Sequence, residues 1–262
     1  MKALVRSMMV PHRIVLLLIG VAIFGWAIYA LDWSWLPEYI QNGLLLKGLW
    51  TTIYMLVISW AVGLFLAIWL GLAQAAGPWY LALPAKGFCS VIRGTPLLLQ
   101  LWFFYYGLGS IFPHFPSIRE SWAWEYLRQA WPYALFSLTL SFAGYEGEVM
   151  RGAFLGVPKG QLEAARAYGM PRFTILRRIW LPQAVRRVLP TMGGETVLQL
   201  KSTPLIATIT VLDLYQASLQ IRQDTYIIYE PLLLLAVIYL IVTGIIVALF
   251  HLVERQVPSK RS

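Results

Sequence analysis

The chain has 262 residues, of which 59% are hydrophobic and only 13% are charged. Several apolar runs are long enough to cross a bilayer as helices and lack the strict alternation of a membrane β-barrel, so the composition excludes a soluble domain and predicts an all-α polytopic membrane protein. The net charge of +9 would suit a nucleic-acid partner, but the basic residues follow the expected membrane topology. The predicted partner is therefore the lipid bilayer and not a nucleic acid. The single cysteine, Cys89, rules out an internal disulfide, and no metal site is predicted.

The N-terminal segment combines a basic start with a long apolar run. Residues 1–13 carry three basic side chains and no acid, and residues 14–31 are apolar. These are also the ingredients of a signal peptide, but the apolar run is long and no small-x-small cleavage site follows it. We therefore predict an additional, uncleaved N-terminal transmembrane helix within residues 1–35.

Five further spans follow along the chain. They are expected at residues 44–72, 83–108, 132–157, 189–212 and 231–250. With the first helix they make about six transmembrane helices, and an even number places both termini on the same side.

The distribution of charge predicts the orientation of these helices. Most of the 21 Lys and Arg residues lie near the N-terminus, around the 77–93 turn, in residues 151–187 and in the tail at 256–262, whereas most acids lie in the alternate links. Because positive residues collect on the cytoplasmic side, the long loop at 158–190, the basic tail and both termini are expected in the cytoplasm.

The loop at residues 158–190 is too basic and too rich in proline to cross a membrane. A helix is expected at 161–168, Gly169 suits a left-handed C-terminal cap, and Pro171 suits the first turn of a second helix toward Trp180. An apolar stripe on this second helix is formed by Phe173, Leu176 and Trp180. The pattern alone fits either an amphipathic loop on the bilayer surface or a docking surface for a partner.

Ionisable residues within the predicted spans are costly and point to function. They are Glu146, Glu148, Glu195 and Lys201. Glu148 precedes Arg151 by three residues, which also permits a purely structural ion pair. Residues two apart on a helix face different directions, so only one of Glu146 and Glu148 can face a shared pathway. We expect Glu146 to face the substrate and Glu148 to support it.

Two segments repeat one pattern, Arg93-Gly94-Thr95-Pro96-Leu97 and Lys201-Ser202-Thr203-Pro204-Leu205. In each, the Thr-Pro pair suits an N-cap and a first helical position, so each span is expected to break and restart about halfway across the membrane. Paired broken helices mark binding sites in transporters, because their free amides favour a carboxylate. An ordinary proline kink is the alternative at each segment.

These motifs resemble the permease subunits of bacterial ABC importers, over about residues 40–255. The resemblance rests on the EAA loop and on three intramembrane motifs: Glu163-Ala164-Ala165 with Gly169 and Leu181-Pro182, Arg93-Gly94-Thr95-Pro96, Tyr145-x-Gly147-Glu148, and Lys201-Ser202-Thr203. The chain is most similar to the polar amino acid branch, in particular its histidine, lysine-arginine-ornithine and opine group. It departs from that branch in having Lys-Ser-Thr-Pro where Lys-Asp-Thr-Ser is common, and in adding a helix to a five-span core.

The resemblance implies roles for individual residues. Residues 36–255 would be the permease domain, and its cytoplasmic helix-turn-helix would be the coupling helix that docks on an ATP-hydrolysing subunit. The implied coupling residues are Glu163, Ala164, Ala165, Gly169, Arg172, Leu181 and Pro182. The implied substrate-binding residues are Glu146, Glu148, Arg93, Thr95, Lys201, Thr203 and Tyr145.

The resemblance also implies partners and a cargo. The chain has no phosphate-binding Gly-Lys loop, so it is not an enzyme by itself, needs no cofactor, and leaves ATP and Mg²⁺ to a partner ATPase subunit, expected in two copies. A periplasmic binding protein would deliver the cargo, and a second permease chain, a copy or a paralogue, would complete a pore in the bacterial inner membrane. The expected cargo is a cationic amino acid such as arginine, lysine, ornithine or histidine, with an opine or a neutral or acidic polar amino acid as the alternative.

Two other classes of protein account for fewer of these features. A channel or secondary transporter would explain intramembrane acids and broken helices but leaves the basic hairpin without a purpose. A membrane enzyme would need a metal or a nucleophile with its base, and the three histidines, His12, His114 and His251, are scattered.

Overall fold

The computed structural model describes residues 15, 18–20, 22, 25–26 and 29–256, and within them every regular element is helical. The expected first span falls mostly on residues outside this part of the chain, as does most of the tail at 256–262. The long helices are α4 (Leu44–Ala76), α5 (Trp79–Gly94), α10 (Trp131–Leu155), α13 (Leu181–Ser202) and α15 (Tyr229–Gln256). The shorter helices are α3 (Leu36–Gln41), α6 (Leu97–Trp102), α7 (Gly109–Ile111), α8 (Pro116–Arg119), α9 (Trp124–Leu127), α11 (Lys159–Ala167), α12 (Arg172–Ile175) and α14 (Leu214–Thr225).

Four short segments are wound differently. Phe103–Leu108 and Leu176–Trp180 are π-helical, and Phe112–His114 and Thr203–Ile209 are 3-10 helices. Each continues directly from an α-helix, so none interrupts the order of the bundle.

Two helices in the described part of the chain, α4 and α15, are each long and apolar enough to cross a membrane. Two bent pairs raise this to four if each pair is one span: Trp79–Gly94 with Leu97–His114, and Arg172–Ile209 with Leu214–Thr225. The fourth expected span corresponds to α10, whose polar residues lie largely inside the bundle and lower its apolarity. The total of six spans stays a prediction.

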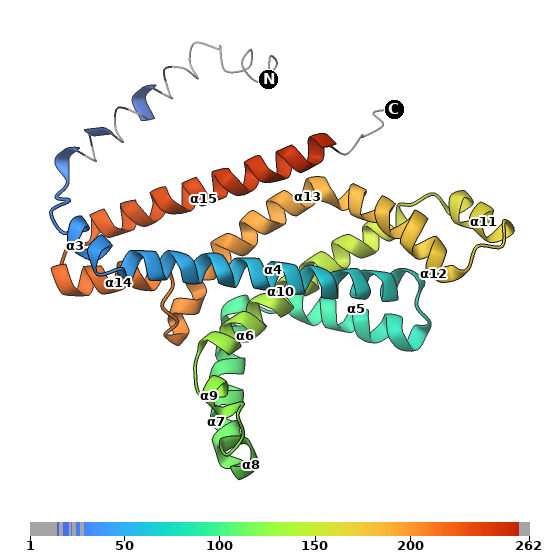
Figure 1. Cartoon of the computed structure of the whole chain (residues 1–262), viewed down its shortest axis with the longest axis horizontal. Coiled ribbons are helices and arrows are strands. Elements are labelled where there is room, and N and C mark those ends of the chain that lie inside the picture. The colour runs from blue at the N-terminus through green and yellow to red at the C-terminus, as the bar shows by residue number, and fades with distance from the viewer. Residues whose placement is uncertain (1–14, 16–17, 21, 23–24, 27–28, 257–262) are drawn as a thin grey trace.

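Helix α10 forms the centre of the bundle and packs along α4, α5 and α13 (Figure 1). Glycines permit the close approach of α4, because a Cβ atom at Gly63 would lie 2.9 Å from the Phe142 ring and one at Gly71 would lie 2.6 Å from Met150 Cβ. Small residues at such seams let helix backbones touch, as is common between membrane helices.

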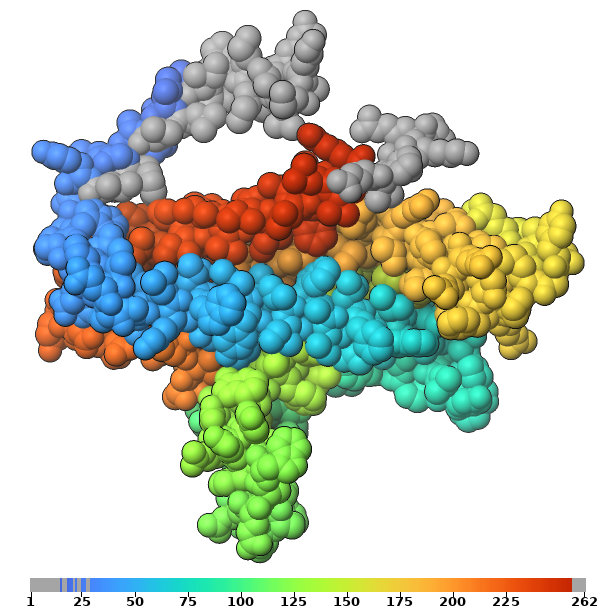
Figure 2. Space-filling model, in the orientation of Figure 1, coloured from blue at the N-terminus to red at the C-terminus, as the bar shows by residue number. Residues whose placement is uncertain are grey.

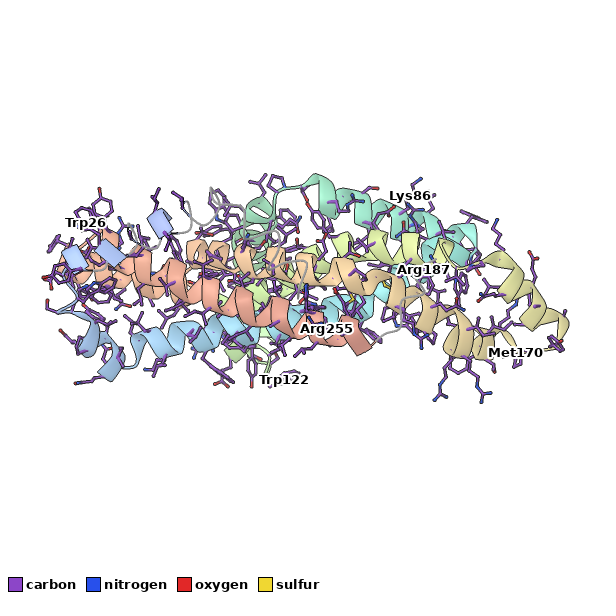
Figure 3. All side chains as sticks on the ribbon, turned by 90° about the horizontal axis from the view of Figure 1, so that it is seen from above. Trp26, Lys86, Trp122, Met170, Arg187 and Arg255 are labelled. Carbon is purple, nitrogen blue, oxygen red and sulfur yellow. The ribbon has the colours of Figure 1, made fainter. Side chains whose placement is uncertain are left out.

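The two ends of the bundle differ. Helices α3 and α14 and the start of α15 lie at one end, and the hairpin of α11 and α12 lies at the other, beside the turn from α4 to α5 (Figure 1). Lys86 and Arg187 lie in the half that carries the hairpin tip at Met170, and Trp26 lies at the opposite end (Figure 3).

The third expected span does not run straight. The chain bends by 105° between α5 and α6, and residues 97–127 form an arm that projects from the bundle (Figures 1 and 2). A break and restart were expected at this segment, and in the structure the break is a bend of 105°.

Candidate functional site

The first Thr-Pro segment makes a sharp corner between α5 and α6. Thr95 is extended, with φ −111° and ψ 134°, as the residue before a proline prefers. Its hydroxyl does not cap α6 but turns back and donates to the carbonyl of Val91 at 2.9 Å. The expectation of a threonine N-cap is therefore wrong here, because Pro96 itself holds the N-cap position.

Gln100 satisfies the acceptors exposed by this corner. Its Nε2 lies 2.9 Å from the Ile92 carbonyl oxygen, 3.0 Å from the Thr95 carbonyl oxygen and 2.9 Å from Thr95 Oγ1. Gln100 is only 7% exposed, and its bond to the Ile92 carbonyl is buried, whereas its two bonds to the exposed Thr95 are partly buried. The corner is thus a built feature and not an ordinary kink.

The second Thr-Pro segment does not break the helix. α13 passes into the 3-10 helix at Thr203, and the chain turns by 50° only between Ile209 and Leu214, where Thr210 has a left-handed φ of 67°. The Thr203 hydroxyl is fully buried, donates to the Leu200 carbonyl at 2.8 Å and lies 2.9 Å from the Tyr239 hydroxyl. Thr203 therefore points into the bundle, which corrects its expected place in a binding site.

A cavity of about 570 Å³ lies where the first corner faces α10 and α13. It is lined by Arg93, Gly94, Thr95, Pro96, Leu97, Ser141, Phe142, Tyr145, Glu195, Leu198, Gln199, Lys201 and Ser202. The structure thus brings together four of the predicted binding residues: Arg93, Thr95, Tyr145 and Lys201.

The charged groups of this cavity are two cations and one acid. Arg93, Glu195 and Lys201 form no ion pair within 4.0 Å in the described part of the chain. The guanidinium of Arg93 lies 5.8 Å from the centre of the Tyr145 ring, a cation–π contact that leaves its N–H donors free. Such an arrangement can bind a ligand that carries both a carboxylate and a cation.

Glu195 also lines this cavity. The sequence marked it as an ionisable residue within a predicted span, but it was not among the predicted substrate-binding residues. It shares a helical face with Leu198, Gln199 and Ser202, which follow at spacings of three, four and seven residues and line the same cavity. The amide nitrogen of Gln199 is buried and donates to Ser59 Oγ and to the Leu138 carbonyl, each at 3.0 Å. These bonds fix α13 against α4 and α10. This helical spacing is a signal that reasoning from the sequence could have used.

Glu146 does not line the cavity. Its side chain is fully buried within the bundle, and neither carboxylate oxygen has a hydrogen-bond partner among the described residues. Its neighbour Tyr145, 44% exposed, faces the cavity instead. The expectation that Glu146 faces the substrate is not met in this structure.

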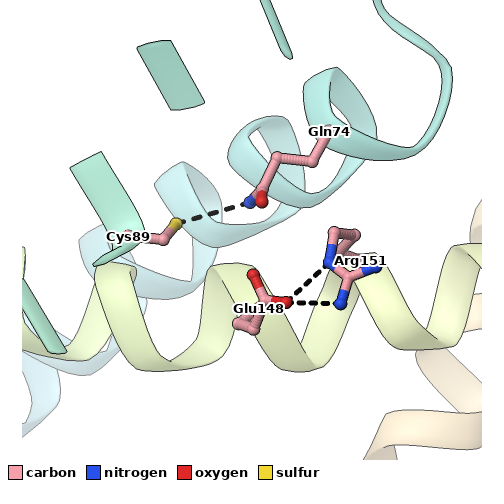
Figure 4. Close-up of polar contacts among 4 residues, drawn as sticks. All are labelled: Gln74, Cys89, Glu148 and Arg151. Carbon is pink, nitrogen blue, oxygen red and sulfur yellow. Dashed lines mark hydrogen bonds and ion pairs between the residues drawn. The ribbon is translucent and has the colours of Figure 1, made fainter. Parts of the chain in front are cut away.

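Glu148 lies in a second cavity of about 470 Å³, which it shares with Gln74, Lys86 and Arg151. Its Oε1 accepts a hydrogen bond from Arg151 Nε at 2.6 Å, as the three-residue spacing allows (Figure 4). Nearby, Gln74 Nε2 donates to the sulfur of Cys89 at 3.4 Å (Figure 4). Glu148 therefore belongs to an ion pair and does not support Glu146.

The basic loop forms the expected helix-turn-helix. α11 ends before Gly169, whose φ of +75° gives the left-handed turn, and α12 begins after Pro171. Ala165 is buried in the hairpin's own core, whereas Glu163 and Ala164 are exposed on its surface.

The hairpin is attached firmly to the bundle. Trp180 Nε1 donates to the Phe154 carbonyl at 2.9 Å, and Leu181 packs against the apolar cluster around Phe154 and Met150. Pro182 lies in the first turn of α13, and the exposed Arg172 opens α12. A force on the hairpin would thus be transmitted to α10 and α13.

Comparisons with known proteins identify the family. The family model "Binding-protein-dependent transport system inner membrane component" matches residues 63–258. The chain belongs to this family. It is therefore the permease subunit of an ABC importer, in which ATP hydrolysis is carried by separate subunits.

Similar proteins cover most of the chain. It is 40% identical to the octopine transport system permease protein OccM of Rhizobium radiobacter, over 83% of this chain and 88% of the relative. It is 33% identical to the histidine/lysine/arginine/ornithine transport system permease protein HisM of Escherichia coli K12, over 85% and 92%. A crystal structure of an amino acid ABC transporter with histidines matches with a TM-score of 0.71 and 28% identity, over 87% of this chain and 99% of that chain. The MetNI methionine transporter shares the fold, with a TM-score of 0.66 at 19% identity, over 82% and 97%.

Proposed function

We propose that this permease takes up amino acids with a cationic side chain across the bacterial inner membrane. A periplasmic binding protein would deliver the cargo, and a second permease chain and two ATPase subunits would complete the importer. The observation that carries the proposal is the cavity at the α5–α6 corner, where two cations and one acid stand without ion-pair partners in the described part of the chain. The relatives named for octopine and for histidine, lysine, arginine and ornithine support a cargo of this chemistry.

Each charged group of the cavity would have one role. Glu195 would pair with the cationic side chain of the cargo, and Arg93 or Lys201 would receive its α-carboxylate. The hydroxyls of Ser141 and Ser202 and the amide of Gln199 are further polar groups along the same wall. Because charge pairs are stronger in a partly desolvated cavity than in water, one lost pair should be measurable in transport.

The orientation proposed for the chain places the hairpin in the cytoplasm. The hairpin end of the bundle collects basic residues, whereas the end formed by α3, α14 and the start of α15 carries Asp224 and Glu230. Both termini would be cytoplasmic, and the hairpin residues Glu163, Ala164 and Gly169 would contact the ATPase subunit. Arg172, which the resemblance also implies as a coupling residue, lines the groove between the hairpin and α4. Closure of the ATPase subunits would then reach the cavity through α10 and α13.

A second candidate cargo is an opine, an amino acid whose nitrogen carries a carboxyalkyl group. The cavity holds two cations for one acid, and a cargo with two carboxylates and one cation would pair with all three. The octopine relative and the nopaline transport system permease protein NocM of Agrobacterium fabrum, 35% identical over 80% of this chain, favour this reading.

The proposal is tested by uptake into vesicles that contain the complete importer and its binding protein. ATP-dependent uptake of labelled arginine, lysine or histidine is expected, and uptake driven by a proton or sodium gradient without ATPase subunits would contradict the proposal. Glu195→Gln should raise the KM for a cationic amino acid by about tenfold, the loss of roughly 1.4 kcal/mol. Glu254→Gln, far along α15 from the cavity, serves as the control.

The same assay separates the alternatives within the cavity. If Glu146→Gln raises the KM and Glu195→Gln does not, the cation is bound by Glu146 after all. If the unchanged importer takes up octopine with a lower KM than arginine, and Lys201→Gln weakens octopine uptake more than arginine uptake, the opine is the better cargo and Lys201 binds one of its carboxylates.

A further inference from the structure

A groove separate from the cavity lies between the hairpin and the membrane helices. It has a volume of about 700 Å³, and it is bounded on one side by the last turns of α4 and the start of α5 and on the other by α11, α12 and the π-helical segment. The hairpin lies beside the α4–α5 turn in the space-filling view, where it forms the right-hand end of the molecule (Figure 2). We call this feature the hairpin groove; its residues include Trp69, Leu72, Leu81, Arg166, Arg172 and Phe173.

The hairpin groove joins an apolar wall to a basic one. Among its lining residues are large apolar side chains from both sides, two arginines and no acid. Arg166 and Arg172 are exposed and form no ion pair within 4.0 Å in the described part of the chain, although Glu163 lies one turn before Arg166. A complementary ligand therefore carries an anionic group at one end and an apolar chain at the other.

The groove also lies where the membrane span ends. α4 ends at Ala76 and contains an 18-residue window with a mean hydropathy of 2.3, and Trp79 and Tyr80, just after the turn, are 78% and 60% exposed. Exposed tryptophan and tyrosine mark the level of lipid headgroups. Trp69, 53% exposed, lies about two turns back along α4 from Ala76.

We propose that the hairpin groove binds an anionic phospholipid of the cytoplasmic leaflet. Its phosphate would lie between Arg166 and Arg172, and one acyl chain would lie along Trp69, Leu72 and Phe173. Basic pockets on the cytoplasmic side of membrane helices bind such headgroups, because several guanidinium donors meet one phosphate. The inference rests on the proposed function only for the orientation that places this end in the cytoplasm.

The bound lipid would brace the hairpin against α4. The groove is lined by Arg166 of α11, Phe173 of α12 and Leu72 of α4, so a lipid there would touch both hairpin helices and the transmembrane helix at once. The exposed surface around Glu163 and Ala164, on the other hand, stays free for the ATPase subunit.

The test uses the complete importer in lipid nanodiscs with a phosphatidylglycerol that carries a photoactivatable group on its acyl chain. Crosslinked peptides are mapped by mass spectrometry, and labelling is expected on the segments that contain Trp69 and Phe173. In the double variant Arg166→Gln/Arg172→Gln, the yield of crosslinked peptide should fall about tenfold, since each basic residue contributes to anionic lipid binding. Arg177→Gln/Arg178→Gln is the matched control, because these exposed arginines of the same hairpin do not line the groove, and its labelling should not change.

Four outcomes would overturn the proposal. They are equal labelling of both double variants, equal labelling by a phosphatidylcholine with the same chain, displacement of the lipid by millimolar inorganic phosphate, and labelling that occurs only after the ATPase subunits are removed. The third would assign a small anion, and the fourth would assign the groove to the ATPase subunit. Uptake is measured in parallel, so an importer that labels as expected but transports no amino acid would contradict the proposed function alone.

Discussion

After Thr95 the chain turns by 105°, whereas after Thr203 it winds on as a 3-10 helix, although both threonines precede a proline and follow a cation and a small residue. Thr95 adopts the extended conformation that a following proline favours. Thr203 stays helical, with φ −60° and ψ −34°, against the same preference. The same sequence pattern therefore forms a corner beside a cavity at Thr95 and a buried stretch of helix at Thr203.

The difference lies in the partners that each threonine meets in the folded protein. At the first segment the Gln100 amide collects the acceptors that the corner exposes. At the second, Tyr239 on α15 meets the Thr203 hydroxyl and keeps the chain wound. The proline permits a break at both segments, and the partners differ: an amide from the next helical turns at the first, and a hydroxyl from the distant helix α15 at the second.

The largest effect is expected from Gln100→Leu. The substitution leaves the buried Ile92 carbonyl and the partly buried carbonyl and hydroxyl of Thr95 without their shared donor. Since each buried polar group that loses its partner costs about 1–3 kcal/mol, the free energy of unfolding should fall by about 2–4 kcal/mol. Unfolding by sodium dodecyl sulfate in mixed micelles measures this quantity.

Gln74→Leu is the control for Gln100→Leu. Gln74 is a half-buried glutamine whose one hydrogen bond among the described residues goes to the Cys89 sulfur at 3.4 Å, a weak acceptor. It should lower the free energy of unfolding by under about 1 kcal/mol. Equal effects of the two substitutions would show that Gln100 does not hold the corner.

A smaller effect is expected from the two threonines, and it should be unequal. Thr203→Val keeps the shape but removes the hydroxyl that meets Leu200 and Tyr239 in a fully buried place, so it should cost about 1–2 kcal/mol. Thr95→Val changes an exposed residue and should cost about 0.5 kcal/mol.

A double-mutant cycle attributes the cost at Thr203 to its partner. Tyr239→Phe in the Thr203→Val background should cost less than Tyr239→Phe in the unchanged protein. Strictly additive effects would mean that the two hydroxyls do not interact, and the account of the second segment would then fail.

The sequence predicted the positions of the helices better than it predicted which side of each helix faces the cavity. Apolar runs and proline positions located α4, α15 and the hairpin within a few residues, because length and local backbone chemistry determine them. The 105° bend was not predicted, since it depends on Gln100 reaching back over the corner. The preceding residues Arg93 and Gly94 gave no sign of its size.

The candidate site was predicted in part for the same reason. Arg93, Thr95, Tyr145 and Lys201 share one cavity, as expected of the site, but Glu146 and Thr203 turn into the bundle. α10 is covered by other helices on several sides, so its sequence does not reveal which side faces a cavity. Glu195 could have been preferred, because its helical face carries Gln199 and Ser202.

Effects about as small as that of Thr95→Val are expected from the prolines themselves. Pro96→Ala and Pro204→Ala should each lower the free energy of unfolding by about 0.4–1 kcal/mol, because alanine widens the unfolded ensemble while other contacts hold the native backbone. Their effects on transport should differ. Pro96→Ala makes the backbone at Thr95 more mobile beside the cavity, and this mobility must be lost when the cargo binds. The KM for uptake should therefore rise by about threefold. Pro204→Ala should leave the KM unchanged, since Thr203 faces away from the cargo. Equal KM values for the two variants, in the vesicle assay described above, would show that the corner does not shape the cavity and that the two segments differ in structure alone.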